Sequence, residues 1–555
     1  MTEADPAHPA ATAADLVLGR SGDGAIGLVF EDQTWTWAEV VEQSAARAAW
    51  LEAGRGPGPF HVGVLLENVP EYLFLLAGAA LCGATVVGLN PTRRGAELAR
   101  DVRHTDCQVV ITDTERTGKL RELQLGSAAG HVIDCSGSPY LAAVSDHLGA
   151  ALPCPRPDEQ DLFLLIFTSG STGEPKAVRV SHGRAARSAV GMRFRPADVL
   201  YSAMPMFHGN ALFASVLPAW HAGCRLVLRR RFSASAFLDD VRTNKCTYFN
   251  TVGRAIAHIN ATPPSGRDRD HDLKWVLGPE TSEADKAAFT ARFGVPVIDG
   301  YGSSENAVVL HPATGAGPGA LGVAPAGADV AVVDAETLAE CEVARFDAGG
   351  RLLNAGEAIG ELVGRNSGGR FEGYYNDPDA ESSRLRNGWY WSGDLAYRDG
   401  DGVFYFAGRS GDWLRVDSEN FAAGPVERIL ARAPGVRGVA VYPVPDARTG
   451  DQVMAALEMA NAEAFDPELI SAFLSDQPDF SPKWAPTYIR VVTALPVTAT
   501  DKVDKRPLRA ARWRTTDPVW CRPPRSMRFE PMGQSDIEAL EAEFDANGRA
   551  NLLQA

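Results

Sequence analysis

Short apolar runs rich in β-branched residues alternate with amphipathic stretches along most of the chain. Such runs predict buried strands. The clearest are His61–Leu66, Val109–Thr112, Leu162–Phe167, Arg225–Leu228 and Val295–Asp299. The amphipathic stretches predict helices such as Trp37–Ala53 and Phe237–Lys245, the second of them capped by Ser233 or Ser235. This alternation predicts an α/β fold whose mixed, largely parallel sheets are covered by helices.

One uncharged stretch, Tyr72–Thr92, has the length of a membrane span. Its composition changes from leucine and alanine to Ala84-Thr85-Val86-Val87, and it also contains glycines and an Asn90-Pro91 pair. These features are typical of a helix that ends and a strand that follows it. We therefore expect a buried helix and a buried strand here, and no transmembrane segment.

A change of pattern near Gly408–Asp412 predicts a domain boundary. Gly402–Ala407 alternates as a strand before this point, and a new series of elements begins after it. We predict a large N-terminal domain, residues 1–408, and a small α+β C-terminal domain, residues 409–555.

The C-terminal domain is expected to contain a helix near Pro425–Arg432 and a strand at Gly438–Val444. An acidic amphipathic helix, Ser535–Phe544, lies near the end of the chain. Ala313–Gly327 is rich in glycine, alanine and proline, and is predicted to be a surface loop.

Composition and charge narrow the range of functions. Of the 555 residues, 45% are hydrophobic and 22% charged, which is ordinary for a globular protein. The formal net charge of −16 argues against a nucleic-acid partner, because binding of that kind needs a basic field. The eight cysteines include no CxxC pair and no zinc-type spacing, so reduced thiols are expected. No secretory signal opens the chain, and we expect a cytoplasmic protein.

A segment rich in serine, threonine and glycine follows the predicted strand Leu162–Phe167. Its glycines allow backbone N–H groups to approach a polyphosphate, its hydroxyls add donors, and its lysine adds a positive charge. The candidate phosphate-binding residues are Thr168, Ser169, Gly170, Ser171, Thr172, Gly173 and Lys176. The lysine is separated from the second glycine, which excludes the Walker motif of P-loop nucleotidases.

Thr168–Lys176 resembles the phosphate loop of a superfamily that contains acyl-CoA synthetases, peptide-synthetase adenylation domains and luciferases. The resemblance extends from Thr34-Trp35-Thr36 to Leu508. The chain looks most similar to the fatty-acyl and very-long-chain acyl-CoA synthetase branch, through the stretch YYNDPDAESSRLRNGWYWSGDLAYRDGDGVFYFAGRSGDWLR. This resemblance implies a mobile C-terminal domain that closes over the larger one. It also implies an AMP-forming enzyme that uses ATP and Mg²⁺, with coenzyme A as co-substrate.

A second motif, Tyr301-Gly302-Ser303-Ser304-Glu305, resembles the YGxTE element of the superfamily. The resemblance implies that Tyr301 lies against the adenine, Ser304 lies near the α-phosphate and Glu305 is the Mg²⁺ ligand. A carboxylate beside phosphate-facing hydroxyls is a chemically suitable magnesium site.

Three further residues complete the expected nucleotide site. Asp394, in Ser392-Gly393-Asp394, and Arg409 resemble residues that reach the ribose, and an ionised carboxylate can accept both ribose hydroxyls. Lys502 resembles the adenylation lysine, although aspartate precedes it where glycine is usual, and Lys505 is the nearest alternative. The predicted catalytic residues are Lys502, Glu305, Thr172 and Lys176.

The acid is expected to bind near Met204–Asn210, where relatives place a histidine or an aromatic residue beside the carboxylate; a buried structural histidine is the alternative. No acidic residue lies in Met204–Ala214, which argues against an α-amino acid substrate. The candidate pocket residues are His208, Asn210, Phe249, Asn250, Gly253 and Asn306. The loop Gly278, Pro279 and Glu280 is expected to bind the nucleotide and to complete the acyl walls.

Two departures from the branch bear on function. Asn306 follows Glu305 where glycine is usual, which bears on specificity for long-chain acids. Ser418 replaces the glycine of a GEN element and, with Glu419 and Asn420, is expected to line the coenzyme A passage, so it bears on thiol delivery.

The sequence therefore predicts a fatty or aryl acid–CoA ligase that forms an acyl-adenylate, releases pyrophosphate and transfers the acyl group to coenzyme A. The alternatives are a secondary-metabolism relative that uses ATP and nitrite to diazotise an aryl amine, an adenylating enzyme with another acceptor, and a nucleotide-sensing pseudoenzyme. Joint retention of the nucleotide motifs argues against the last. Only small-molecule partners are expected. If the acid is long-chain, we also expect peripheral contact of the protein with a membrane. The sequence does not predict an oligomeric state.

Overall fold

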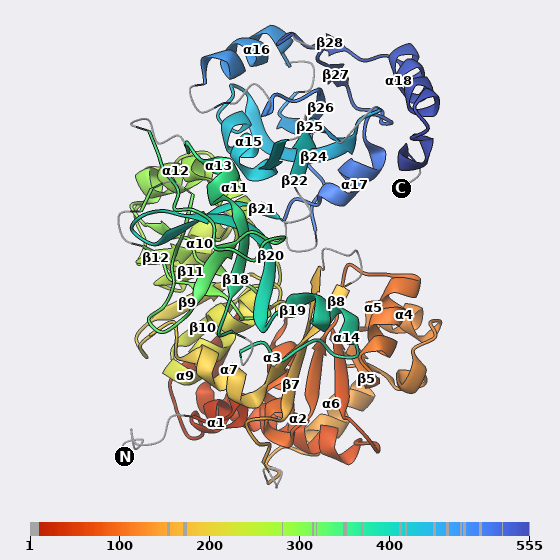
Figure 1. Ribbon diagram of the computed structural model, residues 1–555. Coiled ribbons are helices and arrows are strands. Elements are labelled where there is room, and N and C mark those ends of the chain that lie inside the picture. Colours follow the sequence, from red (N-terminus) through yellow and green to blue (C-terminus); the bar gives the residue numbers. More distant parts are fainter. Residues whose placement is uncertain are drawn as a thin grey trace. The chain divides into compact units, whose positions relative to one another are not determined.

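A computed structural model describes residues 10–151, 156–169, 175–279, 281–313, 316–317, 319–347, 352–367, 370–409, 413–416, 419–447, 451–461, 465–477, 480, 484–498, 502–523 and 526–553. Contacts within the chain divide it into two compact units (Figure 1). The first contains Met1–Ala307 and Gly369–Ser383, and the second contains Val308–Gly368 and Arg384–Ala555. The predicted boundary between residues 408 and 409 falls within the second unit. Because residues 410–412 are outside the described ranges, a hinge there stays a prediction.

The first unit contains a sheet with the strand order β6-β5-β3-β4-β7-β8. Its neighbouring strands are parallel, except that β8 runs antiparallel to β7. The strands are β3 (His61–Leu65), β4 (Thr85–Gly88), β5 (Cys107–Thr112), β6 (Val132–Asp134), β7 (Leu162–Ser169) and β8 (Pro175–Ser181). The apolar runs predicted as strands in this region are therefore confirmed.

A second sheet of the first unit has the order β13-β12-β11-β9-β10-β1-β2, parallel except for the edge strand β2. Its strands are β1 (Ile26–Phe30), β2 (Gln33–Thr36), β9 (Val199–Ser202), β10 (Arg225–Leu228), β11 (Tyr248–Asn250), β12 (Trp275–Leu277) and β13 (Val297–Ile298). The strand predicted at Val295–Asp299 is shorter than expected.

The main core of the first unit lies between these two sheets. Val62 and Val64 of β3 face it from one sheet, and Leu28 and Leu226 face it from the other. The helices that fill the space are α1 (Ala13–Leu18), α2 (Trp37–Ala53), α3 (Pro70–Cys82), α6 (Ser138–Ser145), α7 (His182–Ala189) and α9 (Leu217–Ala222). Helix α2 has the predicted bounds, because Thr36 and Glu39 form a reciprocal capping box at its start.

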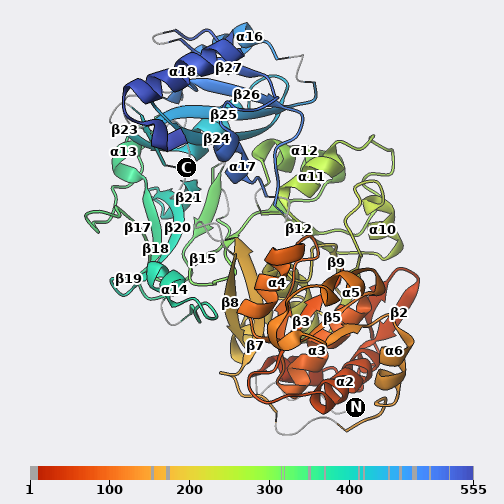
Figure 2. The same ribbon diagram turned by 90° about the vertical axis from the view of Figure 1, so that its right-hand side faces the viewer.

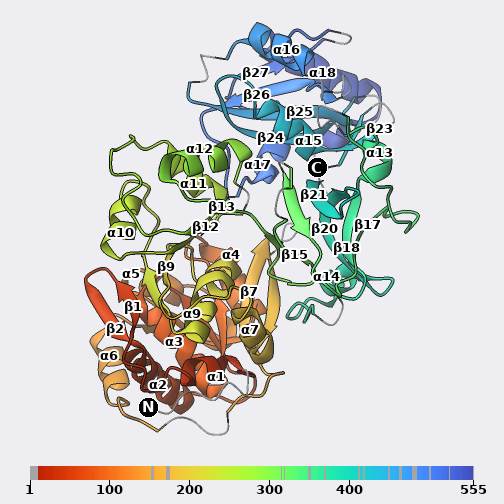
Figure 3. The same ribbon diagram turned by 90° about the vertical axis from the view of Figure 1, so that its left-hand side faces the viewer.

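The outer faces of the sheets are covered as well. Side chains alternate along a strand, so Leu65 points away from Val64 and packs with α4 (Gly95–His104) and α5 (Thr114–Arg121) (Figure 2). The outer face of the second sheet carries α10 (Phe237–Thr243), α11 (Gly253–Asn260) and α12 (Glu283–Phe293) (Figure 3). Sheets buried on both faces are the predicted α/β arrangement.

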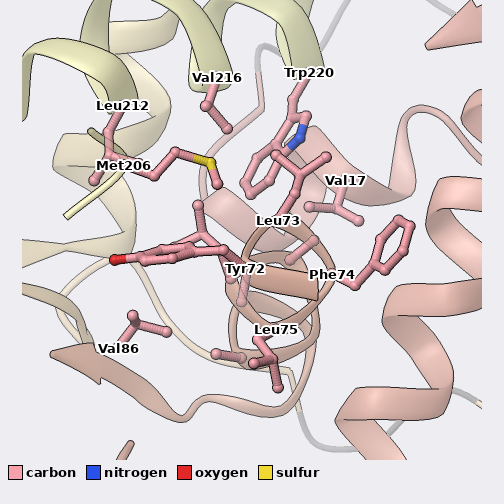
Figure 4. Packing of buried hydrophobic residues seen from close by; sticks show 14 of the residues in the cluster. Val17, Tyr72, Leu73, Phe74, Leu75, Val86, Met206, Leu212, Val216 and Trp220 are labelled. Carbon is pink, nitrogen blue, oxygen red and sulfur yellow. The ribbon is translucent and has the colours of Figure 1, made fainter. Parts of the chain in front are cut away.

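Helix α3 confirms how the uncharged stretch is used. Its side chains from Tyr72 to Cys82 are buried. Figure 4 shows Leu73, Phe74 and Leu75 pointing in different directions from the helix axis, with Trp220 among the surrounding side chains. Gly83 ends the helix in a left-handed conformation and β4 follows. In the described part of the chain no helix is long and apolar enough to cross a membrane.

The start of α10 differs from the prediction. Its N-cap is Ala236, and neither predicted serine caps it by a side-chain hydrogen bond. Ser233 Oγ instead accepts a hydrogen bond from the N–H of Ala236, the residue just before the helix. The helix ends at Thr243, where the prediction extended to Lys245.

The second unit begins with an antiparallel sheet of order β16-β21-β20-β18-β17, with β19 paired to β20. Its strands are β16 (Ala320–Val323), β17 (Val330–Val333), β18 (Gly360–Gly364), β19 (Leu385–Arg386), β20 (Trp389–Arg398) and β21 (Val403–Arg409). Ala313–Gly327 was predicted to be a loop, but its described part contains β16. The strand forms because Ala320–Val323 pairs with β21, a partner that local composition does not reveal.

The rest of the second unit is an α+β layer with the sheet order β24-β25-β26-β27-β28. Helices α15 and α16 pack on one face and α17 and α18 on the other. The elements are β22 (Trp413–Val416), β23 (Glu419–Ala422), α15 (Ala423–Leu430), β24 (Val436–Pro445), β25 (Asp451–Met459), α16 (Pro467–Asp476), β26 (Tyr488–Val492), α17 (Lys505–Ala511), β27 (Val519–Cys521), β28 (Glu530–Pro531) and α18 (Gln534–Ala546). The small α+β fold predicted for this region is confirmed.

Candidate active site

The phosphate segment connects two antiparallel strands. The β7–β8 register pairs Thr168 with Lys176 and Ser169 with Pro175. Gly170, Ser171, Thr172 and Gly173 lie outside the described residues, so the expected cradle stays a prediction. Lys176 lies on β8, within the described residues. Lys176 is only 4% exposed, and a cation so deeply buried needs favourable electrostatic partners.

A distant segment lies along β8. The Arg179 N–H donates to the Gly373 carbonyl at 3.1 Å, and the Tyr375 N–H donates to the Ala177 carbonyl at 2.8 Å. Glu372 fixes the end of the segment, because its carboxylate accepts from both the N–H and the hydroxyl of Ser181 at 2.6 Å. These bonds bring residues 372–375 to the free edge of β8, the strand that leads out of the phosphate segment.

This segment places Tyr374 between two predicted site residues. The Tyr374 hydroxyl donates to Glu305 Oε1 at 2.9 Å, and the Lys176 ammonium lies 5.4 Å from the centre of the Tyr374 ring. All three side chains are buried. The structure therefore joins Lys176 to Glu305 through a tyrosine to which the sequence assigned no role. Tyr374 lies in the stretch that resembles the acyl-CoA synthetase branch, and no local spacing in the sequence relates it to Lys176 or Glu305.

The predicted α-phosphate residue, Ser304, lies beside Met204–Asn210, the predicted substrate segment. A β-carbon added at Gly209 would come within 3.1 Å of Ser304 Oγ. The Ser304 carbonyl accepts a hydrogen bond from Arg184 on α7, whose guanidinium also donates to the Arg179 carbonyl and lies 5.6 Å from the Phe213 ring centre. Arg184 is a second buried residue of this region that the sequence did not indicate.

Tyr301 and Gly302 form the short strand β14 (Tyr301–Gly302), ahead of Ser303 and Ser304. Asn306, directly after Glu305, has φ of +56°. Glycine adopts this conformation readily and asparagine tolerates it better than most residues. The backbone conformation at this position would therefore suit the glycine that the resemblance leads us to expect. The predicted pocket role of Asn306 stays a prediction.

The substrate segment is positioned by Asn68. Its amide donates to the carbonyls of Met204 and Arg229 at 2.9 and 3.1 Å, and its oxygen accepts from the Met206 N–H at 2.9 Å. His208 then stands at the start of α8 (Gly209–Ala211), with its ring 4.7 Å from that of Phe207. Asn68 is far from this segment in sequence, so no local pattern could have identified it.

Other pocket candidates divide into two groups. Asn250 Nδ2 contacts the Asn210 carbonyl at 3.4 Å and Ser215 Oγ at 3.1 Å, and the Gly253 N–H donates to the Pro279 carbonyl at 3.0 Å. These contacts bring Asn210, Asn250, Gly253 and the Gly278-Pro279 pair close to one another. Glu280 lies outside the described residues. Phe249 is not brought to them. It neighbours Asn250 on β11, faces the opposite side of the sheet and packs in the outer core with Tyr201 and Phe237.

In the second unit, the two predicted ribose residues are cross-strand partners. The β20–β21 register pairs Asp394 with Arg409. Asp394 is buried, and its N–H donates to Ser392 Oγ at 3.1 Å. Gly393 has φ of +74°, and its N–H donates to the buried Glu361 carboxylate at 2.9 Å. Burial raises the pKa of Glu361.

The predicted adenylation lysine, Lys502, lies in the same unit, next to an isolated antiparallel bridge between Val497 and Val503. The Thr498 N–H donates to the Lys502 carbonyl at 2.7 Å, and the Lys502 side chain is exposed. Lys505, the alternative, lies at the start of α17 and forms an ion pair of 2.8 Å with Glu427. The choice between the two lysines stays a prediction. Asp501 lies outside the described residues.

The expected coenzyme A passage lies on the β22–β23 hairpin, whose register pairs Val416 with Glu419 and Arg415 with Asn420. Ser418 lies in the connection between the strands and is outside the described residues. The coenzyme A passage therefore stays a prediction.

The residues present fit a magnesium ion that arrives with a nucleotide. No group of three histidine, cysteine, aspartate or glutamate side chains gathers as a metal cluster in the ranges that the structure describes. Magnesium in phosphate-transferring sites is typically held by one or two carboxylates, and the substrate phosphates supply further ligands. Glu305, buried and hydrogen-bonded through one oxygen, is a suitable carboxylate of this kind.

Family profiles match most of the chain. The profile described as AMP-binding enzyme matches residues 18–375, and the one described as AMP-binding enzyme C-terminal domain matches residues 425–502. The chain belongs to the family of AMP-binding enzymes.

Curated relatives resemble this AMP-binding enzyme over nearly its whole length. It is 48% identical to the steroid-22-oyl-CoA synthetase of Rhodococcus jostii (strain RHA1), covering 98% of this chain and 99% of that protein. It is 42% identical to the medium/long-chain-fatty-acid–CoA ligase FadD17 of Mycobacterium marinum (strain ATCC BAA-535 / M), covering 93% and 98%.

Solved structures confirm the fold. The anthranilate CoA ligase AuaEII in complex with anthranoyl-AMP is 22% identical, has a TM-score of 0.79, and covers 92% of this chain and 99% of that one. ATP-bound MatB from Rhodopseudomonas palustris is 22% identical, with a TM-score of 0.78 and coverage of 90% and 98%.

This AMP-binding enzyme is therefore an ATP-dependent, AMP-forming acid–CoA ligase that uses ATP, Mg²⁺ and coenzyme A, as the sequence predicts. Its substrates are small molecules. The relatives named above support coenzyme A as the acceptor, and they give no support to diazotisation with nitrite.

Proposed function

We propose that this ligase activates a bulky, apolar carboxylic acid of the steroid side-chain type. The observation that carries the proposal is the 48% identity to the steroid-22-oyl-CoA synthetase across almost all of both chains. Medium- and long-chain fatty acids are the second candidate class, supported by the 42% identity to FadD17.

The residues around the substrate segment support an apolar acid. Met204, Met206 and Phe207 are buried hydrophobic residues, and no acidic residue lies in residues 204–214 to pair with a substrate ammonium. Ligand pockets that accept apolar molecules are typically lined by hydrophobic side chains, with few polar groups for orientation. His208 and Asn210 are the polar groups that we propose lie nearest to the substrate carboxylate.

In the proposed first half-reaction, an oxygen of the substrate carboxylate attacks the α-phosphorus of ATP and pyrophosphate leaves. Lys502 and Ser304 stabilise the charge that builds on the α-phosphate, and Lys176 binds the phosphates that leave. Glu305 would hold Mg²⁺, which neutralises phosphate charge when bound. Asp394 and Arg409 hold the ribose.

In the second half-reaction the sulfur of coenzyme A attacks the acyl carbonyl and AMP leaves. We propose that the C-terminal region turns about residues 409–412 between the two steps and brings the hairpin of Glu419 and Asn420 to the thiol path. A glycine at 411 would allow the necessary change in backbone dihedrals. We place the reaction in the cytoplasm, with peripheral membrane contact when the acid is long-chain.

A substrate panel tests the proposal. Pyrophosphate release and thioester mass are measured with a steroid-22-oic acid, octanoate, palmitate and benzoate, each with and without coenzyme A. A further arm contains nitrite with an aryl amine. The steroid acid is expected to have a kcat/KM at least about tenfold above the other acids, since one or more large apolar groups separate them. A higher kcat/KM for palmitate would favour the fatty-acid class and overturn the steroid proposal.

A further inference from the structure

The edge of β8 carries a contact that neither the reaction nor the relatives explain. Tyr374 lies along β8 but follows that strand by almost two hundred residues in the sequence. An isolated antiparallel bridge pairs Tyr374 with Val178 of β8. Its hydroxyl reaches Glu305 and its ring lies under the Lys176 ammonium. We propose that Tyr374 is a positioning residue for adenylation: its hydroxyl orients the Glu305 carboxylate toward Mg²⁺, and its ring holds Lys176 toward the ATP phosphates. This proposal rests on the roles proposed above for Glu305 and Lys176.

The hydroxyl contact has a chemical direction. An ionised carboxylate only accepts hydrogen bonds, and the phenol can donate one. With Oε1 engaged at 2.9 Å, rotation of the carboxylate is restricted and Oε2 is left for another partner. Carboxylates that bind metals are commonly held by an outer hydrogen bond of this kind, and its loss weakens metal binding.

The ring contact acts on the lysine. A lysine that is 4% exposed has lost most of its hydration, and the face of a tyrosine ring attracts a cation more strongly when water is excluded. The ammonium lies 5.4 Å from the ring centre, within the range of such an interaction. The ring thus stabilises the buried Lys176 ammonium and helps to fix its position.

The tyrosine is itself firmly placed. Residues on either side of it make backbone bonds to Ala177 and Arg179, and Glu372 accepts two bonds from Ser181. Gly373 has φ of +87°, and a β-carbon there would meet the Glu381 carboxylate at 2.4 Å. A side chain supported in this way can transmit its position to the groups that it contacts.

The neighbouring tyrosine offers a matched control. The Tyr375 hydroxyl donates to Asp106 Oδ2 at 3.0 Å, so Tyr375→Phe also removes one tyrosine-to-carboxylate hydrogen bond from the same segment. Tyr374→Phe removes the hydroxyl and keeps the ring, whereas Tyr374→Leu removes both. Glu305→Gln tests the metal role on which the proposal depends.

The experiment measures equilibrium binding to the full-length protein. Mn²⁺ binding in the presence of α,β-methylene-ATP is followed by electron paramagnetic resonance, and binding of that nucleotide without metal is followed by calorimetry. Tyr374→Phe is expected to weaken Mn²⁺ binding about 10- to 100-fold and to leave metal-free nucleotide binding unchanged. Tyr374→Leu is expected to weaken nucleotide binding as well, by about threefold or more. Tyr375→Phe should change neither quantity.

The outcomes separate the two levels of the argument. If Glu305→Gln leaves Mn²⁺ binding unchanged, the proposed metal role of Glu305 is wrong. The positioning role of Tyr374, which depends on it, is then wrong as well. If Glu305→Gln weakens Mn²⁺ binding and Tyr374→Phe does not, the inference alone is wrong. Equal effects of Tyr374→Phe and Tyr375→Phe, or loss of cooperative unfolding in Tyr374→Phe, would assign Tyr374 a purely structural role and overturn the proposal.

Discussion

Replacement of Asn68 by alanine should weaken both the stability of the enzyme and its binding of the acid. Asn68 is 3% exposed and makes three hydrogen bonds, to the Met204 carbonyl, the Arg229 carbonyl and the Met206 N–H. The segment that it holds leads directly into His208. Asn68→Ala therefore removes the support of the proposed carboxylate site without touching that site.

The magnitude follows from the groups left behind. The buried Met206 N–H loses its acceptor, and an unsatisfied buried donor costs about 1–3 kcal/mol. The two carbonyls each lose one donor, which adds roughly 0.5–1 kcal/mol per bond. Water entering the space of the amide would offset part of this loss. We expect a net destabilisation of about 2–4 kcal/mol.

The assay combines unfolding with steady-state kinetics. Thermal unfolding should shift downward by several degrees. In pyrophosphate release, the KM for the acid should rise about tenfold, because small displacements of positioning groups have effects of this size, and the KM for ATP should change less than about twofold. Asn90→Ala is the matched control. Asn90 Oδ1 accepts two hydrogen bonds from Thr92 near the surface, so its loss should destabilise by about 0.5 kcal/mol and leave both KM values unchanged.

Two results would refute this reasoning. A destabilised Asn68→Ala enzyme with an unchanged KM for the acid would show that the segment after Met206 holds its position without the amide. A variant as stable as the wild type would show that the buried groups find other partners, and the counting of unsatisfied groups would be wrong.

Three further predictions concern the reaction itself. Lys502→Ala should reduce adenylation about 10²–10³-fold and leave thioester formation from a supplied acyl-adenylate largely intact, while Lys505→Ala should lose stability more than activity; equal loss of both half-reactions in Lys502→Ala would contradict the assignment. Asn306→Gly should shift preference toward bulkier acids with little strain, since φ of +56° suits glycine, and an unchanged chain-length profile would place Asn306 outside the pocket. Ser418→Gly should raise only the coenzyme A-dependent rate in quenched-flow measurements, because it removes a β-carbon from the proposed thiol path; a wild type whose thioester step already outpaces adenylation would discard that restriction.

Much of the fold follows from the sequence because it depends on local patterns. The start of α2 follows from the capping box of Thr36 and Glu39, and β10 follows from the apolar run Leu226–Leu228, which Arg225 and Arg229 flank. The uncharged stretch separates into α3 and β4 at Gly83, where only the local backbone conformation matters. The reaction class also follows from short motifs, because each of them is local in the chain and resembles a motif of the superfamily.

The tertiary structure decided which distant residues meet. No local pattern relates Asn68 to Met206, Tyr374 to Glu305, or β16 to β21, because these pairs form only when segments far apart in sequence pack together. Phe249 shows the same limit at the level of a single strand. Its neighbour Asn250 faces the substrate segment, and alternation along the strand turns Phe249 into the outer core. The sequence alone thus determined most of the elements and the class of chemistry, and long-range packing determined the positions of the groups that support that chemistry.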